Sequence, residues 1–207
     1  MITFRQFLNE GQSPFKNLID TKCSGYIAES GMIGFLVRGM KRVKPDLEIQ
    51  TADGTKVPYA ICSTHESRRP LDTNTTMHDI VDDWFYDKFG WYARSENVLF
   101  CLGDADVQST EMYGNAFIVF PIGSDLKYVW SNDITDLSGR LWAAFGDDKI
   151  EQKRSRIEME LNNANFINTD LKKAIKVATH EIMINCKQYI AVPWKYHDAV
   201  KQDLGMK

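Results

Sequence analysis

Apolar residues recur at helical spacing in several stretches of the chain. The clearest case is residues 75–90, where Met77, Ile80, Val81 and Trp84 follow the i, i+3, i+4, i+7 pattern. This pattern predicts a helix with one buried face. Weaker patterns of the same kind predict further helices at residues 1–10, 133–146 and 147–165, and from residue 193 onwards.

One more helix is predicted from its start signal. Ser13 and Pro14 match the N-cap and the first helical position, because proline lacks the N–H group that the first turn leaves unbonded. We expect this helix to end near Gly25 or Gly31, since glycine readily adopts the left-handed conformation that closes helices.

Short apolar runs bounded by turn residues predict strands. Residues 32–40 form one such run. Asp53 and Gly54 separate residues 47–51 from residues 56–63, and an Asp-Gly pair between two such runs is a strong hairpin signal. Further strands are predicted at residues 96–103 and 115–123, and a second hairpin within residues 178–193.

Length and composition then limit the class of protein. The chain has 207 residues, 43% of them hydrophobic, which suits one ordinary domain, expected at residues 11–207. The mixture of elements predicts an α+β fold with a split, mostly antiparallel sheet flanked by helices. A net charge of -3 argues against broad nucleic-acid binding, although a small nucleic-acid pocket stays compatible with it. No apolar stretch is long enough to span a bilayer, so we expect no membrane partner.

The sequence favours a metal site neither at His180 and Glu181 nor at the four cysteines. A zinc peptidase needs a second histidine four residues after His180, and Ile184 stands there. The cysteines lack the close spacing of structural zinc sites, so we expect no metal and predict buried, reduced thiols in a reducing compartment. The four cysteines are Cys23, Cys62, Cys101 and Cys186.

A different chemistry is suggested by two strand ends. The buried run "GFLVRGM" ends in Arg38 and Gly39, and Glu181 directly precedes the late apolar run of "HEIMINCKQYIAV". Both features resemble the arginine-serine-glutamate branch of the ADP-ribosyltransferases, and the resemblance spans residues 33–192. For the serine motif of that family, "YARSENVLF" offers Ser95, with Arg94 as a competing match. Thr179 replaces an acidic or amide residue common in the family, which favours a target other than arginine.

The resemblance implies roles for five residues in a reaction that uses NAD. Glu181 would stabilise the positive charge that develops on the ribose as nicotinamide leaves. Arg38 would hold a phosphate or ribose oxygen, and Gly39 would allow the backbone to approach the nicotinamide. Ser95 would orient Glu181 or the ribose, and Arg69 would clamp the pyrophosphate. Taken from the sequence alone, Glu181 also fits a solvated strand start and Arg69 a solvated loop.

The first eleven residues carry a second resemblance. "MITFRQFLNEG" is similar to the cleavable capsid-targeting leader of internal head proteins in large tailed phages, whose maturation protease cuts after a glutamate. Here the cut would follow Glu10 and leave Gly11 as the new N-terminus. The alternative is an ordinary frayed helix over residues 1–10.

Together, the two resemblances imply a mono-ADP-ribosyltransferase, a glycosyltransferase in chemical class, that is stored in the phage virion and injected into the host cytoplasm. Its partners would be the phage head, the maturation protease and a host acceptor, a protein in the first place and a nucleic acid in the second. Two alternatives stay open. One is a non-enzymatic internal head protein that inhibits a host defence complex, and the other is a transferase-like fold that acts on nucleic acid.

Overall fold

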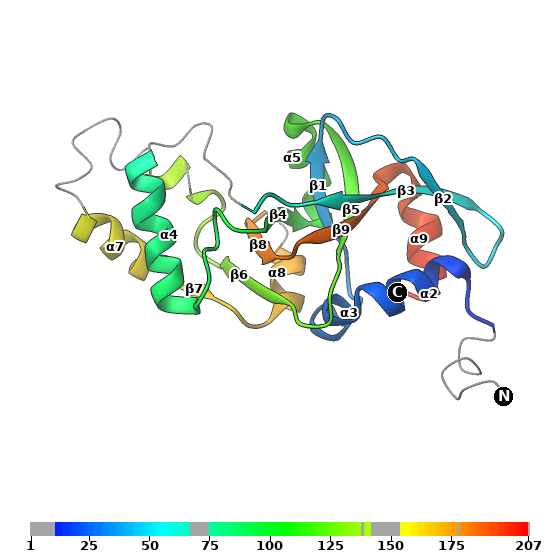
Figure 1. Ribbon diagram of the computed structural model, residues 1–207, viewed down its shortest axis with the longest axis horizontal. Helices are drawn as coiled ribbons and strands as arrows, with labels where there is room; N and C mark the ends of the chain where they lie inside the picture. Colours follow the sequence, from blue (N-terminus) through cyan, green and yellow to red (C-terminus); the bar gives the residue numbers. More distant parts are fainter. Residues whose placement is uncertain (1–10, 67–74, 138, 142–153, 178, 207) are drawn as a thin grey trace.

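The computed structural model describes residues 11–66, 75–137, 139–141, 154–177 and 179–206. Within these residues nine strands form one sheet, and all neighbouring strands in it run antiparallel (Figure 1). The α+β prediction is therefore confirmed. The strands are β1 (Leu36–Met40), β2 (Leu47–Gln50), β3 (Lys56–Ser63), β4 (Val98–Gly103), β5 (Asn115–Pro121), β6 (Lys127–Ser131), β7 (Phe166–Ile167), β8 (Ile182–Asn185) and β9 (Gln188–Pro193).

Helices lie towards both ends of the sheet, and two short helices, α5 and α8, lie near its middle (Figure 1). Helices α4 and α7 pack together at one end of the molecule, and α2, α3 and α9 lie towards the other end (Figure 1). The α-helices are α2 (Pro14–Lys22), α3 (Ser24–Ser30), α4 (Thr75–Phe89), α5 (Val107–Thr110), α7 (Arg154–Asn163), α8 (Leu171–Val177) and α9 (His197–Asp203). Short 3-10 turns are η1 (Asp104–Asp106), η2 (Glu111–Tyr113) and η4 (Trp194–Tyr196).

The sheet has a narrow connection between β1 and β4, which we call the β1–β4 junction. The strand order is β2-β3-β9-β5-β1-β4-β8-β6-β7. Strands β1 and β4 pair at two positions, Leu36 with Gly103 and Val37 with Leu102, whereas β1 and β5 pair at five. The junction joins a half made of β2, β3, β9, β5 and β1 to a half made of β4, β8, β6 and β7.

The last two strands do not form the predicted hairpin. Strand β8 pairs with β4 and β6, whereas β9 pairs with β3 and β5. Residues 186 and 187 between them carry the chain from one half of the sheet to the other. The hairpin prediction was wrong because a short link does not require the strands that it joins to be partners. The Asp53-Gly54 hairpin of β2 and β3 is confirmed.

The larger core lies around Phe120 of β5. The rings of Phe15, Tyr26 and Phe35 meet this ring edge-on, with centroids 6.2, 5.9 and 6.0 Å away. Such edge-to-face pairs contribute about 0.5–1.5 kcal/mol each beyond the burial of their surface. They fix α2 and α3 against the sheet, since Phe15 belongs to α2 and Tyr26 to α3.

A second core lies between the sheet and helices α4 and α7. Trp84, Phe85 and Phe166 pack at centroid distances of 4.9 to 6.0 Å. Met183 of β8 belongs to this core, while its neighbours Ile182 and Ile184 belong to the larger one. Side chains alternate in direction along a strand, so β8 is covered on both faces.

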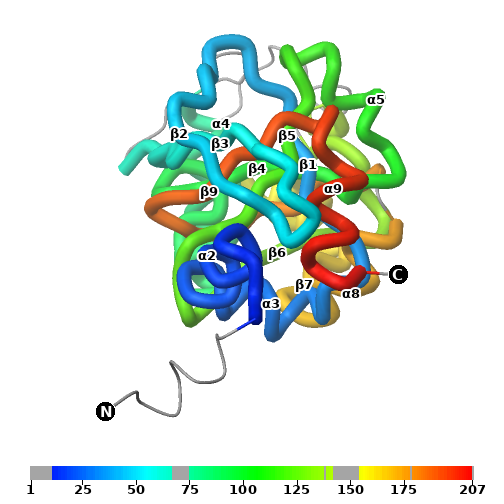
Figure 2. The backbone as a smooth tube through the Cα atoms, turned by 90° about the vertical axis from the view of Figure 1, so that its right-hand side faces the viewer, coloured from blue at the N-terminus to red at the C-terminus, as the bar shows by residue number. Residues whose placement is uncertain are grey.

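The predicted start of the first described helix is confirmed. The Ser13 side chain accepts a hydrogen bond from the Lys16 amide at 2.9 Å, and Pro14 is the first helical residue. The Ser13 hydroxyl also donates to Asp203 of α9. The other carboxylate oxygen of Asp203 accepts from the Ala52 amide at 2.6 Å. Asp203 therefore ties α2 and the β2–β3 hairpin to α9, at the end of the molecule that Figure 2 turns towards the viewer.

The other predicted helices are seen to different extents. The helix that starts at Pro14 ends at Lys22, before either predicted glycine, and Gly31 with its positive φ of 56° closes the separate helix α3. Helix α7 (Arg154–Asn163) agrees with the helix predicted at residues 147–165, of which residues 147–153 lie outside the described residues. Helical residues 137 and 139–141 agree with the prediction at 133–146, whose remainder after residue 141 lies outside the described residues, as does the predicted helix at residues 1–10.

Candidate functional site

Arg38 lies directly beyond the β1–β4 junction. Val37 is the last residue of β1 that pairs with β4, and the half-buried Arg38 follows it. Arg38 Nη1 donates a hydrogen bond to the carbonyl oxygen of Phe100 on β4, at 3.1 Å. The guanidinium thus bridges the two strands where their pairing has ended, and this hydrogen bond uses one of its five N–H donors.

The absence of a side chain at Gly39 has a steric explanation within the fold. A Cβ atom there would lie 1.9 Å from the carbonyl oxygen of Thr110 and 2.9 Å from Cβ of Tyr113. Thr110 ends α5 and Tyr113 ends η2, so glycine allows this segment to pack directly on β1. The group that closely approaches Gly39 on the side of its missing Cβ is therefore the segment of Thr110 and Tyr113.

Glu181 stands at the start of β8, on the other side of β4. Its amide donates to the carbonyl oxygen of Thr135 at 3.2 Å, which holds the backbone in place. Its side chain is 26% exposed, and its carboxylate accepts a hydrogen bond from Arg94 Nη1, 3.2 Å from Oε2. The carboxylate is thus paired with a cation and still accessible from solvent.

Arg94 connects Glu181 to the same part of β4 that Arg38 reaches. Its side chain is 13% exposed, and the guanidinium lies over the Phe100 ring at 5.3 Å from the centroid. Phe100 therefore contacts Arg94 through its ring and Arg38 through its carbonyl group. Burial raises the pKa of the neighbouring Cys101 thiol, and the Arg38 charge lowers it while the Glu181 charge raises it. Arg38 thus contacts residue 100, and Glu181 directly precedes Ile182, which pairs with Cys101.

Ser95 is engaged with a buried carboxylate on α4. Its hydroxyl donates to Asp82 Oδ2, and the Arg94 amide donates to Oδ1 of the same carboxylate at 2.9 Å. Asp82 is 5% exposed, and His78 lies one helical turn before it. Burial lowers the pKa of His78, and the negative charge of Asp82 opposes this shift. Sequence reasoning did not identify Asp82 as part of the site. The signal was a His-Asp pair at i, i+4 spacing beside the apolar face of the helix.

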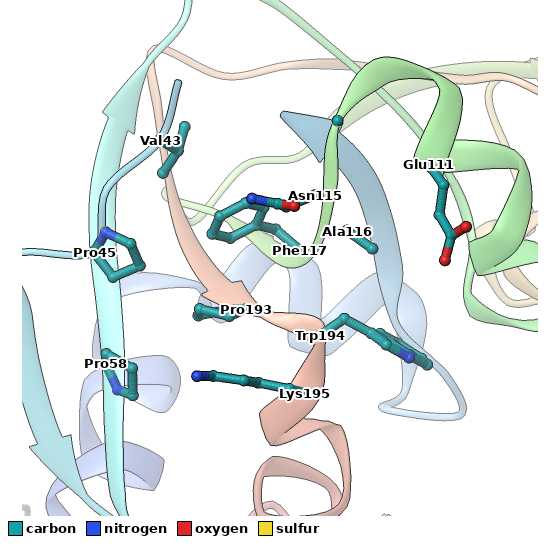
Figure 3. Close-up of a pocket in the computed structure, with 11 residues that line it drawn as sticks. Val43, Pro45, Pro58, Glu111, Asn115, Ala116, Phe117, Pro193, Trp194 and Lys195 are labelled. Carbon is teal, nitrogen blue, oxygen red and sulfur yellow. The ribbon is translucent and has the colours of Figure 1, made fainter. Parts of the chain in front are cut away.

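A groove of about 870 Å³ lies beside Arg38's strand (Figure 3). Figure 3 shows Phe117 and Asn115 near its centre, with Lys195 and Glu111 on different sides. Three prolines, Phe117 and Trp194 give it apolar walls, and Glu111, Asn115 and Lys195 add polar groups. The groove is lined by Val43, Pro45, Pro58, Glu111, Gly114, Asn115, Ala116, Phe117, Pro193, Trp194 and Lys195.

A smaller hollow of about 440 Å³ shares Val43 with this groove. It contains Arg38 and Gly39 together with two tyrosines and further cations. Its lining residues are Arg38, Gly39, Met40, Lys41, Arg42, Val43, Tyr113 and Tyr189. Glu181 and Ser95 are not among the described residues that line either space. The structure therefore places Arg38 and Glu181 on either side of β4, and of the two only Arg38 lines the hollow.

Arg69 lies outside the described residues. In the part of the chain that the structure describes, no three His, Cys, Asp or Glu side chains are placed to hold a metal ion. The same part contains no helix that is long and apolar enough to cross a bilayer.

Comparison of the chain with protein-family models, with curated proteins and with solved structures finds no match. The function must therefore be argued from the residues and their geometry.

Proposed function

We propose that the protein is an NAD-dependent mono-ADP-ribosyltransferase of tailed-phage origin with an ADP-ribosyltransferase-like fold. One observation carries the proposal. Arg38 and Glu181, 143 positions apart in the sequence, lie on either side of β4, where Arg38 donates to Phe100 and Glu181 directly precedes Ile182, the pairing partner of Cys101. The narrow β1–β4 junction beside them supports a fold in which two half-sheets meet at the site.

The reaction needs a carboxylate in the place that Glu181 occupies. The bond between ribose C1′ and the nicotinamide nitrogen breaks, and its electron pair leaves with nicotinamide. The acceptor nucleophile then forms a bond to C1′ and loses its proton. Positive charge develops on the ribose in between, and an accessible carboxylate stabilises it. Glu181 supplies the negative charge of this carboxylate, and the hydrogen bond from its amide to Thr135 fixes its backbone.

Arg38 is the residue for binding NAD. The donors that its bond to Phe100 leaves over can reach a phosphate or ribose oxygen in the adjoining hollow, where Lys41 and Arg42 add positive charge. Ser95 supports the site through Asp82, and Arg69 stays a proposed contact to the pyrophosphate. The acceptor is a host protein or, as the second candidate, a nucleic acid.

The storage of the enzyme follows from the leader resemblance. An enzyme carried in the phage head enters the host cytoplasm with the genome, where NAD and the acceptor are both present. The phage head and its maturation protease would be its partners before infection.

The test is the transfer of labelled ADP-ribose from NAD to proteins or nucleic acids of a host lysate. We expect Glu181→Gln to lower the rate at least about a hundredfold, since removing charge stabilisation of this kind costs roughly 3 kcal/mol. Glu160→Gln is a matched control, because Glu160 also pairs with an arginine at 3.2 Å but lies outside the site. Activity of Glu181→Gln within threefold of the unmodified protein would remove Glu181 from the mechanism. Protease and nuclease treatment of the labelled product then identifies the acceptor.

A second candidate is a non-enzymatic internal head protein that binds and inhibits a host defence complex. The observation in its favour is the groove between Glu111 and Lys195, beside which Met112 and Tyr113 are 72% and 62% exposed. Exposed apolar side chains around a groove are typical of protein-binding surfaces. The same assay separates the candidates, because a pure binder transfers no label from NAD.

A further inference from the structure

The chain has a second arginine at the candidate site whose geometry the proposed reaction does not yet explain. Arg94 is held from two directions. The guanidinium lies over the Phe100 ring at 5.3 Å from its centroid, and its Nη1 donates to Glu181 at 3.2 Å. A guanidinium held by both a ring and a charged hydrogen bond has little freedom to turn.

The backbone beneath Arg94 is fixed as well. One buried carboxylate, Asp82, accepts from the Arg94 amide and from the Ser95 hydroxyl. Asp82 is 5% exposed and lies on α4, whose neighbouring residues Val81 and Phe85 are buried in the second core. The turn that carries Arg94 is thus anchored to a rigid helix.

The hydroxyl that was expected to orient the glutamate is therefore used elsewhere. Ser95 donates to Asp82, whereas Arg94, its neighbour, donates to Glu181. Among the contacts that the structure gives the Glu181 carboxylate, the side chain that directs it is the cation Arg94.

We propose that Arg94 is the positioning residue of Glu181, and that Asp82 fixes Arg94 through the backbone of residues 94 and 95. Arg94 holds the carboxylate in one direction and stabilises its charge between turnovers. The proposal rests on the proposed function, because it assigns a role relative to the catalytic carboxylate.

The kinetic test compares Arg94→Met, Arg94→Lys and Glu181→Gln in NAD cleavage. We expect Arg94→Met to lower kcat at least about tenfold with little change in KM, since the carboxylate loses its orientation rather than the substrate its binding site. Arg94→Lys should recover part of kcat, because it keeps the charge but not the planar group. Arg140→Met is the matched control, as Arg140 pairs with Glu160 at the same 3.2 Å outside the site.

The double variant separates a role through Glu181 from an independent one. If Arg94 acts through Glu181, then Arg94→Met should cost nothing further once Glu181 is glutamine. Additive losses would overturn the positioning role, and so would an Arg94→Met variant with the kcat of the unmodified protein.

A readout without NAD keeps this proposal distinct from the proposed function. In nuclear magnetic resonance spectra of the full chain, the Nη–H signals of a held guanidinium are separate, and they merge when the group rotates freely. We expect separate Arg94 signals that merge in Glu181→Gln. Merged signals in the unmodified protein overturn the positioning role. If the Arg94 signals are separate but the protein does not cleave NAD, the pairing of Arg94 with Glu181 stands and the proposed function is overturned instead.

Discussion

Replacing Gly39 by alanine places a methyl group where the fold has no room. An added Cβ would lie 1.9 Å from the Thr110 carbonyl oxygen, and ordinary contact begins at 3.4 Å. The obstacle is backbone, so it cannot move aside as a flexible side chain would. Thr110 is buried, and its hydroxyl donates to the Val107 carbonyl oxygen at 2.6 Å. The alanine variant must therefore displace α5 from β1 by well over an ångström.

The size of the effect follows from this displacement. Forcing an extra methyl group into a packed core costs about 1–3 kcal/mol, and the upper end applies where backbone must shift. We expect a loss of about 3 kcal/mol in the free energy of unfolding. For a chain of this length that corresponds to a fall in Tm of roughly 6–12 °C.

Urea and thermal unfolding measure the change directly. Gly90→Ala is the control, since Gly90 has a φ of 76° and no atom within 4 Å of an added Cβ. Its cost is backbone strain alone, about 1–2 kcal/mol. A Gly39→Ala variant as stable as the unmodified protein would show that α5 does not pack on β1 in this way.

Three further outcomes are expected. Arg38→Lys should weaken NAD binding about tenfold in isothermal titration, because an ammonium cannot reproduce the planar fork, and unchanged affinity would make Arg38 a structural bridge to β4. Burial raises the pKa of both Cys23 and Cys186 from 9.0 to about 12. The free energy of unfolding should therefore fall as the pH rises from about 9 towards 12, because the unfolded thiols lose their protons first, and a flat urea-unfolding profile over that range would contradict this. Protein from mature phage particles should begin at Gly11, whereas protein expressed alone should keep Met1, and N-terminal sequencing of particles that retain Met1 would exclude the leader.

The elements that the sequence predicted well carry their signals locally. The Ser13-Pro14 start and the Asp53-Gly54 turn are each decided by a few neighbouring residues. Helix α8 has Leu171, Ala174 and Ile175 at helical spacing, but it is too short for a pattern that becomes distinct over 11 or more residues, and it was not predicted. The pairing of β8 and β9 depends on strands distant in sequence, so the hairpin expectation failed.

The candidate site was predictable in part for the same reason. Arg38 lies in β1 and Glu181 directly precedes β8, so the apolar runs of these strands draw attention to both. Arg94 and Ser95 lie in a turn before β4, where no alternation of faces says which side chain points towards the glutamate. Their different partners are set by α4, because Asp82 engages the serine hydroxyl and leaves Glu181 to the arginine.

The place of β9 in the sheet has a consequence for how the protein is made. This strand is the last of the nine described strands along the chain, yet it lies between β3 and β5 and pairs with both. Until it leaves the ribosome, those two strands present unpaired edges, which are open to pairing with other chains. The nascent protein is therefore exposed to aggregation from the synthesis of β3 and β5 until that of β9, and this late strand ends the exposure by closing one half of the sheet.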